Sequence, residues 1–427
     1  MSKRLLLCVL LLSGLTTFAD PLTTNLTPEI AVSTALSGNR DLIAARFAIR
    51  QAEGRLKQAG LWPNPEFELS QQNDHPIANE GEYNFSTGFK QRFPITGRLT
   101  KAKAVARVDV AMAMAEVRNQ ERLLAGEVLA FSREWLVTQE KLKANEEIQS
   151  TIQKLVEVSE KRLKVAEVSE ADVNLAKLEL QKLTLAQAAL LNQQEIAATE
   201  LNRLLGREPK TPLQISGVIS AEFDTNAVTE ISREVLARRP DRQLAALGMD
   251  RGAAEIKLAR AVKWEDWTVG FDYSRSVGKF AAPIGTKTDN FLGVGVSIPL
   301  PLWNRNQGRI SEAQATRLRA EAELSALDLR IATEAQTAEN KMHRLLGILR
   351  QYREESIKLA EKNIGLLQKG YADGLVGITG VIQAQQQLTE LRRSELEALA
   401  DFFRAKTEWE TATASSPFLK SQSPNKP

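Results

Sequence analysis

The chain contains the same pattern twice, each time a helical stretch, two alternating strands, a very long helix, a short break and a further helix. Matching residues lie 202 positions apart early in the pattern and 207 to 208 positions apart later. The matched pairs are Glu53 and Glu255, Leu56 and Leu258, Trp62 and Trp264, Pro94 and Pro301, Val173 and Val381, and Glu200 and Glu408. Because most of the increase falls across the strands, we expect a longer hairpin loop in the second half. The repeat indicates a duplicated supersecondary unit, so the fold must contain two copies of it.

The repeat also predicts the domain organisation. We expect a signal peptide over residues 1–19, a first repeat over 28–206 and a linker over 207–229. A second repeat follows over 230–414, and a polar tail with three prolines, predicted to be disordered, covers 415–427. The linker is recognised by Pro209, Pro212 and Gly217.

The first residues have the pattern of a secretory signal. Lys3 and Arg4 precede an apolar run over 5–15, and Ala19 ends a small-residue cleavage site. The only cysteine, Cys8, lies in that run, so the mature chain would have no disulfide and no thiolate metal ligand. Cleavage removes two cations and lowers the net charge from +3 to +1, which argues against a nucleic-acid partner. No later apolar run approaches the length of about 20 residues that a membrane helix needs.

Two segments are too long to be helices of a compact globular domain. Residues 98–163 contain no proline and a single glycine, Gly126, and are rich in strong helix formers. These roughly 65 residues would make a rod of about 100 Å. Residues 308–369 are the counterpart, and helices over 169–205 and 379–413 follow the two breaks. We expect two further helices, over 28–60 and 230–262, to stack end to end on these shorter ones. The chain would then form a tall helical wall. A periplasmic or cytosolic coiled coil is the alternative.

Four segments alternate between apolar and polar residues, as strands with one apolar face do. They cover 66–71, 84–93, 267–274 and 291–298. The predicted lipid-facing residues are Phe85, Phe89, Phe93, Trp267, Val269, Phe271, Leu292, Val294 and Val296. A soluble sheet on a core is the alternative, but the long helices have their own seams to bury, which leaves lipid to cover this face. Four strands cannot close a barrel, and an open edge is prohibitive in hydrocarbon, so several chains must contribute.

Five motifs carry a family resemblance. They are Asn39-Arg40-Asp41-Leu42 with Ala44-Ala45, Arg239-Pro240-Asp241 with Ala245-Ala246, Gln91-Arg92-Phe93-Pro94-Ile95, Leu201-Asn202-Arg203-Leu204-Leu205-Gly206, and the duplicated helix breaks. With these motifs the chain resembles the TolC-like outer-membrane efflux proteins over residues 28–414. The segment Trp62-Pro63-Asn64-Pro65-Glu66 is similar to the heavy-metal branch that contains CzcC.

The chain departs from the family pattern in two places. Gly97 and Arg98 stand where the heavy-metal branch has a Gly-Gly-Lys type of turn. The stretch from Asp241 to Glu255 is two residues longer than the one from Asp41 to Glu53, which predicts an irregular helix near Gly248 or Gly252.

The resemblance implies a mainly α fold with a small β part. Each helix–strand–strand–helix–helix unit would supply long α-helical hairpins to a periplasmic tunnel. Its strands would join a trimeric, twelve-stranded outer-membrane β-barrel. The implied partners of this outer-membrane homotrimer are lipid, a periplasmic adaptor protein and an inner-membrane pump of the RND type.

By the same resemblance the two helix breaks dock the adaptor and close the tunnel. The residues assigned to adaptor binding are Lys164, Val165, Ala166, Glu167, Val168, Ser169 and Asp172 in the first break, and Ala372, Asp373, Gly374, Leu375, Val376 and Thr379 in the second. Asp373 is the candidate gate. Ser169 and Thr379 are expected to cap the returning helices, and Val168, Leu375 and Val376 are expected to be exposed.

The sequence offers no support for catalysis. Its two histidines, His75 and His343, lie in no motif of a hydrolase, metalloprotease or phosphate-binding enzyme. We therefore expect a passive export channel with no cofactor and no resident metal. Heavy-metal cations are the first expectation for the cargo, and drug efflux or type I secretion is the alternative.

Overall fold

The computed structural model describes residues 25–75, 77, 80–217, 219 and 239–415. The predicted signal peptide with Cys8, the linker residues 218 and 220–229, the start of the second repeat at 230–238, and the tail from 416 onwards lie outside the described residues. The chain divides into two compact units, each containing parts of both repeats. The turn unit lies within Met1–Ala35, Val128–Ser220 and Arg350–Ala400, and the sheet unit lies within Leu36–Glu127, Ala221–Leu349 and Asp401–Pro427.

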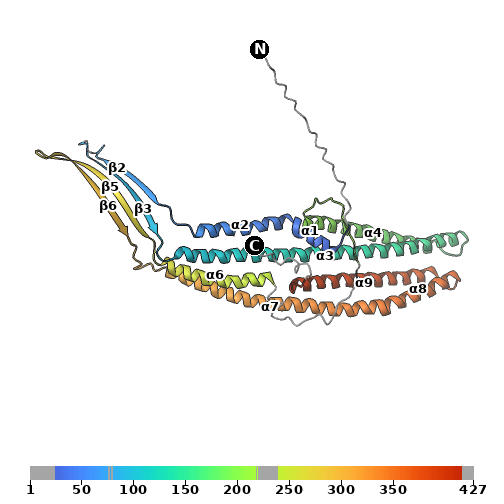
Figure 1. The fold of residues 1–427 in the computed structure, drawn as a ribbon. Coiled ribbons are helices and arrows are strands. Elements are labelled where there is room, and N and C mark those ends of the chain that lie inside the picture. The colour runs from blue at the N-terminus through green and yellow to red at the C-terminus, as the bar shows by residue number, and fades with distance from the viewer. Residues whose placement is uncertain (1–24, 76, 78–79, 218, 220–238, 416–427) are drawn as a thin grey trace, which may run out of the picture. The chain divides into compact units, whose positions relative to one another are not determined.

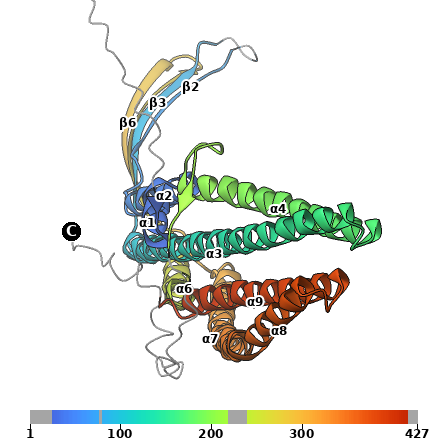
Figure 2. The same ribbon diagram turned by 90° about the vertical axis from the view of Figure 1, so that its right-hand side faces the viewer.

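The turn unit is built mainly from helical hairpins. The later part of α3 (Arg98–Lys164) turns into α4 (Glu170–Leu205), and α8 (Ile357–Ala372) turns into α9 (Ile378–Ala412). Figure 2 shows α4 beside α3 and α9 beside α8. Ile152, Leu183 and Ile382 belong to one buried cluster to which all four helices contribute, so the two hairpins pack on a common core.

Two short strands and the first helix complete the turn unit. Strand β1 (Asn25–Leu26) pairs in parallel with β4 (Gln214–Ile215), and α1 (Pro28–Gly38) follows β1 directly. Leu26 and Ile215 are almost completely buried, so this strand pair holds the start of the linker against the rest of the unit.

The sheet unit contains one curved antiparallel sheet with the strand order β2-β3-β5-β6 (Figure 1). These strands are β2 (Glu66–Asn73), β3 (Tyr83–Phe93), β5 (Trp267–Phe280) and β6 (Gly285–Ser297). Its helices are α2 (Arg40–Ala59), α6 (Pro240–Val262), most of α7 (Gln307–Gln351), the first part of α3 and the end of α9. Among the described residues β2 and β6 each have one strand neighbour in this sheet, so the sheet has two open edges.

The repeating helix–strand–strand–helix–helix order is as predicted, but the first helix is divided. Residues 28–60 were expected to form one helix, whereas α1 ends at Gly38 and α2 starts at Arg40. Asn39 between them has an extended backbone, and its side-chain oxygen accepts a hydrogen bond of 2.8 Å from the amide of Leu42. It is therefore a helix N-cap, which ends one helix and starts the next.

The prediction of a longer hairpin loop in the second half is wrong. The loop between β2 and β3 spans 74–82, whereas the loop between β5 and β6 spans only 281–284. The second pair has strands of 14 and 13 residues, against 8 and 11 in the first. The added residues continue the ladder as far as Phe280 and Gly285, where a tight turn closes it.

The irregularity expected near Gly248 or Gly252 is also absent, because α6 is one continuous α-helix. A Cβ atom at Gly252 would lie 2.9 Å from Cβ and 3.0 Å from Cα of Arg317. Gly252 thus allows α6 and α7 to approach closely, and its role is one of packing.

Buried residues in the long helices recur at intervals of seven, the period of coiled-coil packing. In α3 these residues are Thr138, Asn145, Ile152 and Ser159; in the second repeat they are Ala335, Met342, Leu349, Ile357, Ile364 and Tyr371. The one interval of eight, from Leu349 to Ile357, contains a π-helical turn, η2 (Tyr352–Ser356). No described helix combines the length and apolar character needed to cross a membrane.

Candidate functional site

The turn between α3 and α4 is fixed by side-chain hydrogen bonds. Ala166 has a positive φ of 61°, and the amide of Glu167 donates to the carbonyl of Arg162 at 2.9 Å. Ser169 caps α4 as predicted: its hydroxyl accepts from the amide of Asp172 at 3.2 Å, and the Asp172 carboxylate accepts from the Ser169 amide at 3.2 Å. This reciprocal capping box satisfies two helix-end donors.

The turn between α8 and α9 depends on glycine. Gly374 has a φ of 73°, and the amide of Leu375 donates to the carbonyl of Gly370 at 2.8 Å. Helix α9 begins at Ile378, so the predicted cap at Thr379 is wrong: Thr379 lies inside the first turn of the helix. Gly377, which precedes the helix, has no side chain with which to cap it.

Exposure of the apolar side chains differs from the expectation. Val165 and Leu375 are 66% and 81% exposed, whereas Val168 and Val376 are half-buried. A methyl group of Val376 lies 2.9 Å from where a Cβ of Gly370 would be, so it packs back on α8. Of the other predicted residues, Asp172 is half-buried, and Lys164, Ala166, Glu167, Ser169, Ala372, Asp373, Gly374 and Thr379 are exposed. Val165 and Leu375 are therefore the apolar contacts available at the two turns.

Arg162 joins the two hairpins of the turn unit. It donates from Nη1 to the carbonyl of Tyr371 at 2.9 Å and from Nη2 to that of Ala372 at 3.2 Å. Its guanidinium lies 4.4 Å from the centroid of the Tyr371 ring, and the Tyr371 hydroxyl lies 3.4 Å from that of Ser159. A cation at the last carbonyls of a helix is favourable both by hydrogen bonding and by interaction with the helix dipole.

Sequence analysis missed Arg162 and Tyr371 and selected Asp373 instead. The Asp373 side chain is exposed, and among the described residues none forms a hydrogen bond or ion pair with its carboxylate. The sequence feature that could have revealed this contact is an arginine just before the first break and a tyrosine just before the second. Arg162 therefore contributes to the contact between the hairpins beside their shared apolar core, while Asp373 as the gate stays a prediction.

The predicted lipid-facing residues all lie on one face of the sheet, because paired residues on neighbouring strands share a face. One row contains Phe89, Phe271 and Val294, and the row next to it pairs Tyr273 with Leu292. Leu292 is 83% exposed, the most of these apolar side chains. The other face carries glycines and charges, including the row Glu68, Gly88, Asp272 and Gly293. Contact of the apolar face with lipid stays a prediction.

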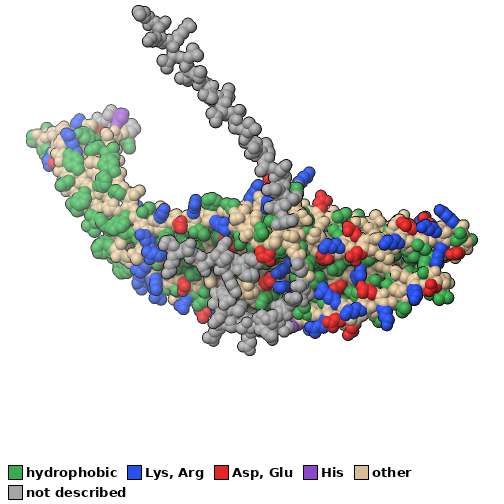
Figure 3. Space-filling model, turned by 45° about the vertical axis from the view of Figure 1, so that its right-hand side comes forward, with side chains coloured by type: hydrophobic (Ala, Val, Ile, Leu, Met, Phe, Trp, Pro, Cys, Tyr) green, Lys and Arg blue, Asp and Glu red, His purple; other side chains and the backbone are tan. Residues whose placement is uncertain are grey.

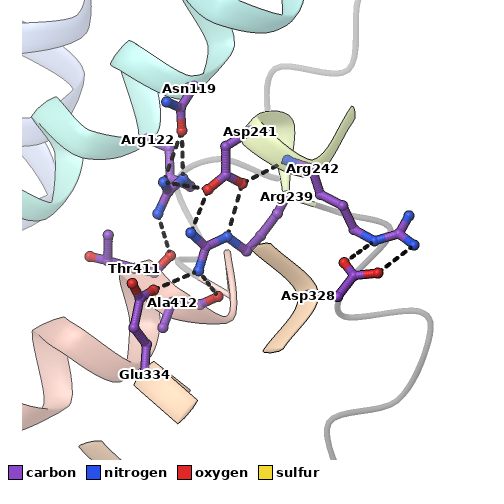
Figure 4. A network of polar contacts seen from close by, with 9 residues as sticks. All are labelled: Asn119, Arg122, Arg239, Asp241, Arg242, Asp328, Glu334, Thr411 and Ala412. Atoms are coloured by element: carbon purple, nitrogen blue, oxygen red, sulfur yellow. Dashed lines mark hydrogen bonds and ion pairs between the residues drawn. The ribbon is translucent and has the colours of Figure 1, made fainter. Parts of the chain in front are cut away.

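A buried polar network fixes the helix ends in the sheet unit (Figure 4). Arg239 binds the carboxylate of Asp241 with two hydrogen bonds, of 2.5 and 3.0 Å, and approaches Glu334 at 3.2 Å. It also donates to the carbonyl of Ala412 at 2.9 Å, near the end of α9. One arginine thus holds the start of α6, the middle of α7 and the end of α9 together.

Arg122 of α3 extends this network into the first repeat. It donates to the carbonyl of Thr411 at 2.7 Å and to Asn119, and it lies 3.6 Å from Asp241. Burial lowers the pKa of Arg122, and the positive charge of Arg239 lowers it further. Burial also opposes the charged form of Arg239, but the bonds to Asp241 and Glu334 outweigh it and raise its pKa. Burial would raise the pKa of Asp241, yet its contacts with Arg239 and Arg122 hold it below 3.8.

The described residues contain no group of three or more histidine, cysteine, aspartate or glutamate side chains that could hold a metal ion. The two histidines, His75 and His343, lie on a loop and on α7. The candidate functional features are therefore the apolar sheet face in the sheet unit and, in the turn unit, a pair of helical turns joined by the Arg162 contact.

Comparison with known proteins identifies the family. The profile of the outer membrane efflux protein family matches residues 31–207 and 231–414, which is most of the chain. The chain belongs to the outer membrane efflux protein family. As a member it is an outer-membrane protein, and the TolC-like fold predicted from its sequence is confirmed by solved structures.

Relatives of this efflux protein agree with that assignment. The cobalt-zinc-cadmium resistance protein CzcC of Cupriavidus metallidurans is 22% identical over 90% of this chain and 88% of CzcC. The pyoverdine export outer membrane protein OpmQ of Pseudomonas putida is 24% identical over 88% of this chain and 85% of OpmQ. The crystal structure of the outer membrane protein VceC of Vibrio cholerae superposes with a TM-score of 0.70, at 16% identity, over 90% of this chain and 95% of VceC. The family and fold are those of passive outer-membrane efflux channels.

Proposed function

We propose that this protein is the passive outer-membrane duct of a three-part exporter. The observation that carries the proposal is the four-stranded antiparallel sheet with an exposed apolar face and two open edges. A single copy of such a sheet would be unstable in water, because its apolar face is exposed, and in lipid, because its edges have unpaired backbone groups. Three copies would supply twelve strands and close a barrel of ordinary size for an outer membrane.

The apolar face has the height that this role requires. It runs from the row of Phe93 and Trp267 to the row of Phe85 and Arg275, where charge first appears. Eight residues separate these rows, which is about 27 Å along a strand and roughly 20 Å along the normal of a barrel tilted by about 40°. A lipid-exposed band of that height matches a thin outer membrane.

The two turns would dock the periplasmic adaptor. Val165 and Leu375 are exposed apolar side chains on separate hairpins of the turn unit, and the backbone around each is held by hydrogen bonds. Arg162, bound to Tyr371 and Ala372, would act as the gate contact. The hairpins can separate only when these two hydrogen bonds break, so adaptor binding at the turns is placed to bias the gate. Energy would come from an inner-membrane pump of the RND type, and this chain would perform no chemistry.

Heavy-metal cations are the proposed cargo, supported by the similarity to CzcC and the Trp62-Pro63-Asn64-Pro65-Glu66 segment. The similarity to OpmQ favours a second candidate, export of an organic molecule such as a siderophore. Under both proposals the selection of cargo belongs to the pump.

Growth of a deletion strain on graded zinc, cobalt, cadmium, copper and nickel, beside a panel of drugs and siderophores, tests the proposal. Sensitivity to metals alone supports cation export. Sensitivity to organic compounds with normal metal tolerance supports the second candidate. Unchanged growth on all of them, in a strain lacking other channels of this family, contradicts an export role.

A further inference from the structure

Exposed cations gather where the helices of the sheet unit meet the sheet. The ladder pairs Glu66 with Lys90, Phe93 with Trp267 and Thr268 with Ser297, so all four strands meet the helices at one end of the sheet. The bordering segments, 55–66, 94–104, 256–267 and 298–310, contain ten lysines and arginines but only three acidic residues. Figure 3 shows these basic side chains beside the largely apolar surface of the sheet.

Most of these cations have no acidic partner. Arg98 pairs with Asp266, and Lys101 donates to the carbonyl of Thr96. The other eight form no ion pair with any described carboxylate, and we call them the basic collar: Arg55, Lys57, Lys103, Lys257, Arg260, Lys263, Arg305 and Arg309. Eight neighbouring positive charges without counter-ions repel one another, so the collar favours an anionic partner from outside the chain.

Several arginines farther from the sheet form ion pairs within the chain. Arg46 pairs with Glu121 at 2.8 Å, Arg242 with Asp328 at 2.7 Å, and Arg251 with Asp109 at 2.6 Å. The same helices therefore pair charges internally elsewhere. Cations without an ion pair to a described carboxylate also occur elsewhere, such as Arg330 and Arg344 of α7, but beside the sheet all eight cations of the basic collar form none.

Exposed aromatic and aliphatic side chains lie among the collar cations. Trp303 is 86% exposed, and Leu300, Leu302, Trp62 and Trp264 are exposed as well. Tryptophan is enriched where hydrocarbon meets lipid headgroups, and lysine and arginine are favoured next to anionic headgroups. The order from the sheet towards the helices is thus apolar, aromatic and then cationic, which is the order of a membrane surface.

We propose that the basic collar binds the phosphate groups of anionic phospholipids in the leaflet nearer the helices. The proposal rests on the proposed function, since it requires the apolar sheet face to lie in the bilayer. Charge complementarity and the continuity of the collar with that face favour lipid over an acidic protein surface. Headgroup binding would set the depth of the sheet in the membrane.

Lipid selectivity of the full mature protein, reconstituted in bilayers, tests the proposal. Electron paramagnetic resonance with spin-labelled phosphatidylglycerol and phosphatidylcholine gives the ratio of their association constants. We expect a ratio of about five for the wild type, the factor that one cation contributes near an anionic surface. It should fall towards one in the variant Arg260→Gln/Lys263→Gln/Arg309→Gln and in the wild type at high salt.

The matched control Arg319→Gln/Arg330→Gln/Arg344→Gln removes three exposed cations from α7 outside the collar and should keep the wild-type ratio. The variant Arg260→Lys/Lys263→Arg/Arg309→Lys should keep it too. A wild-type ratio of one, or a ratio unaffected by the collar substitutions, overturns the proposal and favours a protein partner for the collar. If no lipid is immobilised by the wild type at all, the proposed membrane function fails together with it.

Discussion

Two arginines of α3 make contacts between the repeats, and both donate to backbone carbonyls, but they differ in burial and in charge pairing. Arg122 is buried, lies beside Asp241, and donates to the carbonyl of Thr411. Arg162 is partly exposed, faces an aromatic ring, and binds two carbonyls without a carboxylate closer than 3.8 Å. A charge-paired, buried network is costly to open, whereas neutral acceptors near solvent can be exchanged for water at little cost.

The difference suggests that the two parts of α3 have different roles, one in a fixed junction and one in a contact that can open. The sheet unit needs a fixed junction of α3, α6, α7 and α9, because the strands that these helices support must keep their register. The turn unit needs a contact that holds the hairpins together and can release them. The following experiments test that contrast, beginning with the largest expected effect.

Replacing Asp241 with Asn should destabilise the protein by about 3–5 kcal/mol, since it leaves Arg122 and Arg239 buried with only the half-exposed Glu334 as an acidic partner. Denaturant unfolding of the detergent-solubilised protein, followed by tryptophan fluorescence, measures this change. Asp401→Asn removes an exposed carboxylate paired with Arg404 and should change stability little. Equal effects of the two substitutions would mean that the buried network is not a fixed junction.

The pH dependence sharpens this prediction. The pKa of Asp241 lies below 3.8 in the folded protein, so folded Asp241 stays charged at a pH where the unfolded chain already binds a proton. Its stabilising contribution is therefore complete at neutral pH and declines as the pH falls below about 3.8 through the folded pKa. The Asn variant should lose this part of the acid dependence, which a pH series of the same unfolding experiment measures.

An arginine at Phe89 or Val294 should impair membrane assembly, because a charge on the lipid face at the bilayer midplane costs about 2–4 kcal/mol. Heat-modifiability on gels and outer-membrane fractionation report assembly. Ser86→Arg places the same charge on the opposite face of β3 and serves as the control. Normal assembly of both lipid-face variants would contradict the assignment of the faces.

Arg162→Ala should weaken the contact between the hairpins by about 1–2 kcal/mol, from one cation–π contact and two hydrogen bonds near solvent. Its effect should appear as higher conductance of the reconstituted channel, with little loss of global stability. Arg162→Lys retains the charge without the planar fork and should lie between the alanine variant and the wild type. Wild-type conductance of the alanine variant would remove Arg162 from the gate.

Asp substitutions at Val165 and Leu375 should change stability by less than about 0.5 kcal/mol, since both side chains are largely exposed. We expect them to weaken site-specific cross-linking to the adaptor while trimer formation stays normal. Leu375→Met keeps an apolar side chain of similar size and should cross-link as the wild type does. Undiminished cross-linking of the Asp variants would exclude these turns from docking.

The sequence predicted the features that repeat along the chain. It did not predict the contacts between residues that are far apart in the sequence. Alternation alone placed Phe89, Phe271 and Val294 on one face, and the capping role of Ser169 follows from its local sequence. The contact of Arg162 with Tyr371 joins positions 209 apart, so no local pattern reveals it. Thr379 and Val168 were misjudged for a related reason: the exact path of a turn decides which residue caps a helix and which side chain is covered.

The π-helical turn at Tyr352–Ser356 coincides with one residue that the second repeat has in addition to the first. Pro94 and Val173 lie 79 positions apart in the first repeat, and Pro301 and Val381 lie 80 apart in the second. One added residue in an ideal α-helix turns everything beyond it by about 100° and would swing Ile357, Ile364 and Tyr371 away from their neighbours. The wider turn takes up that residue, and the interval of seven resumes immediately beyond it. The effect of the additional residue is thus confined to one helical turn, and the buried positions beyond it keep the spacing that the first repeat has.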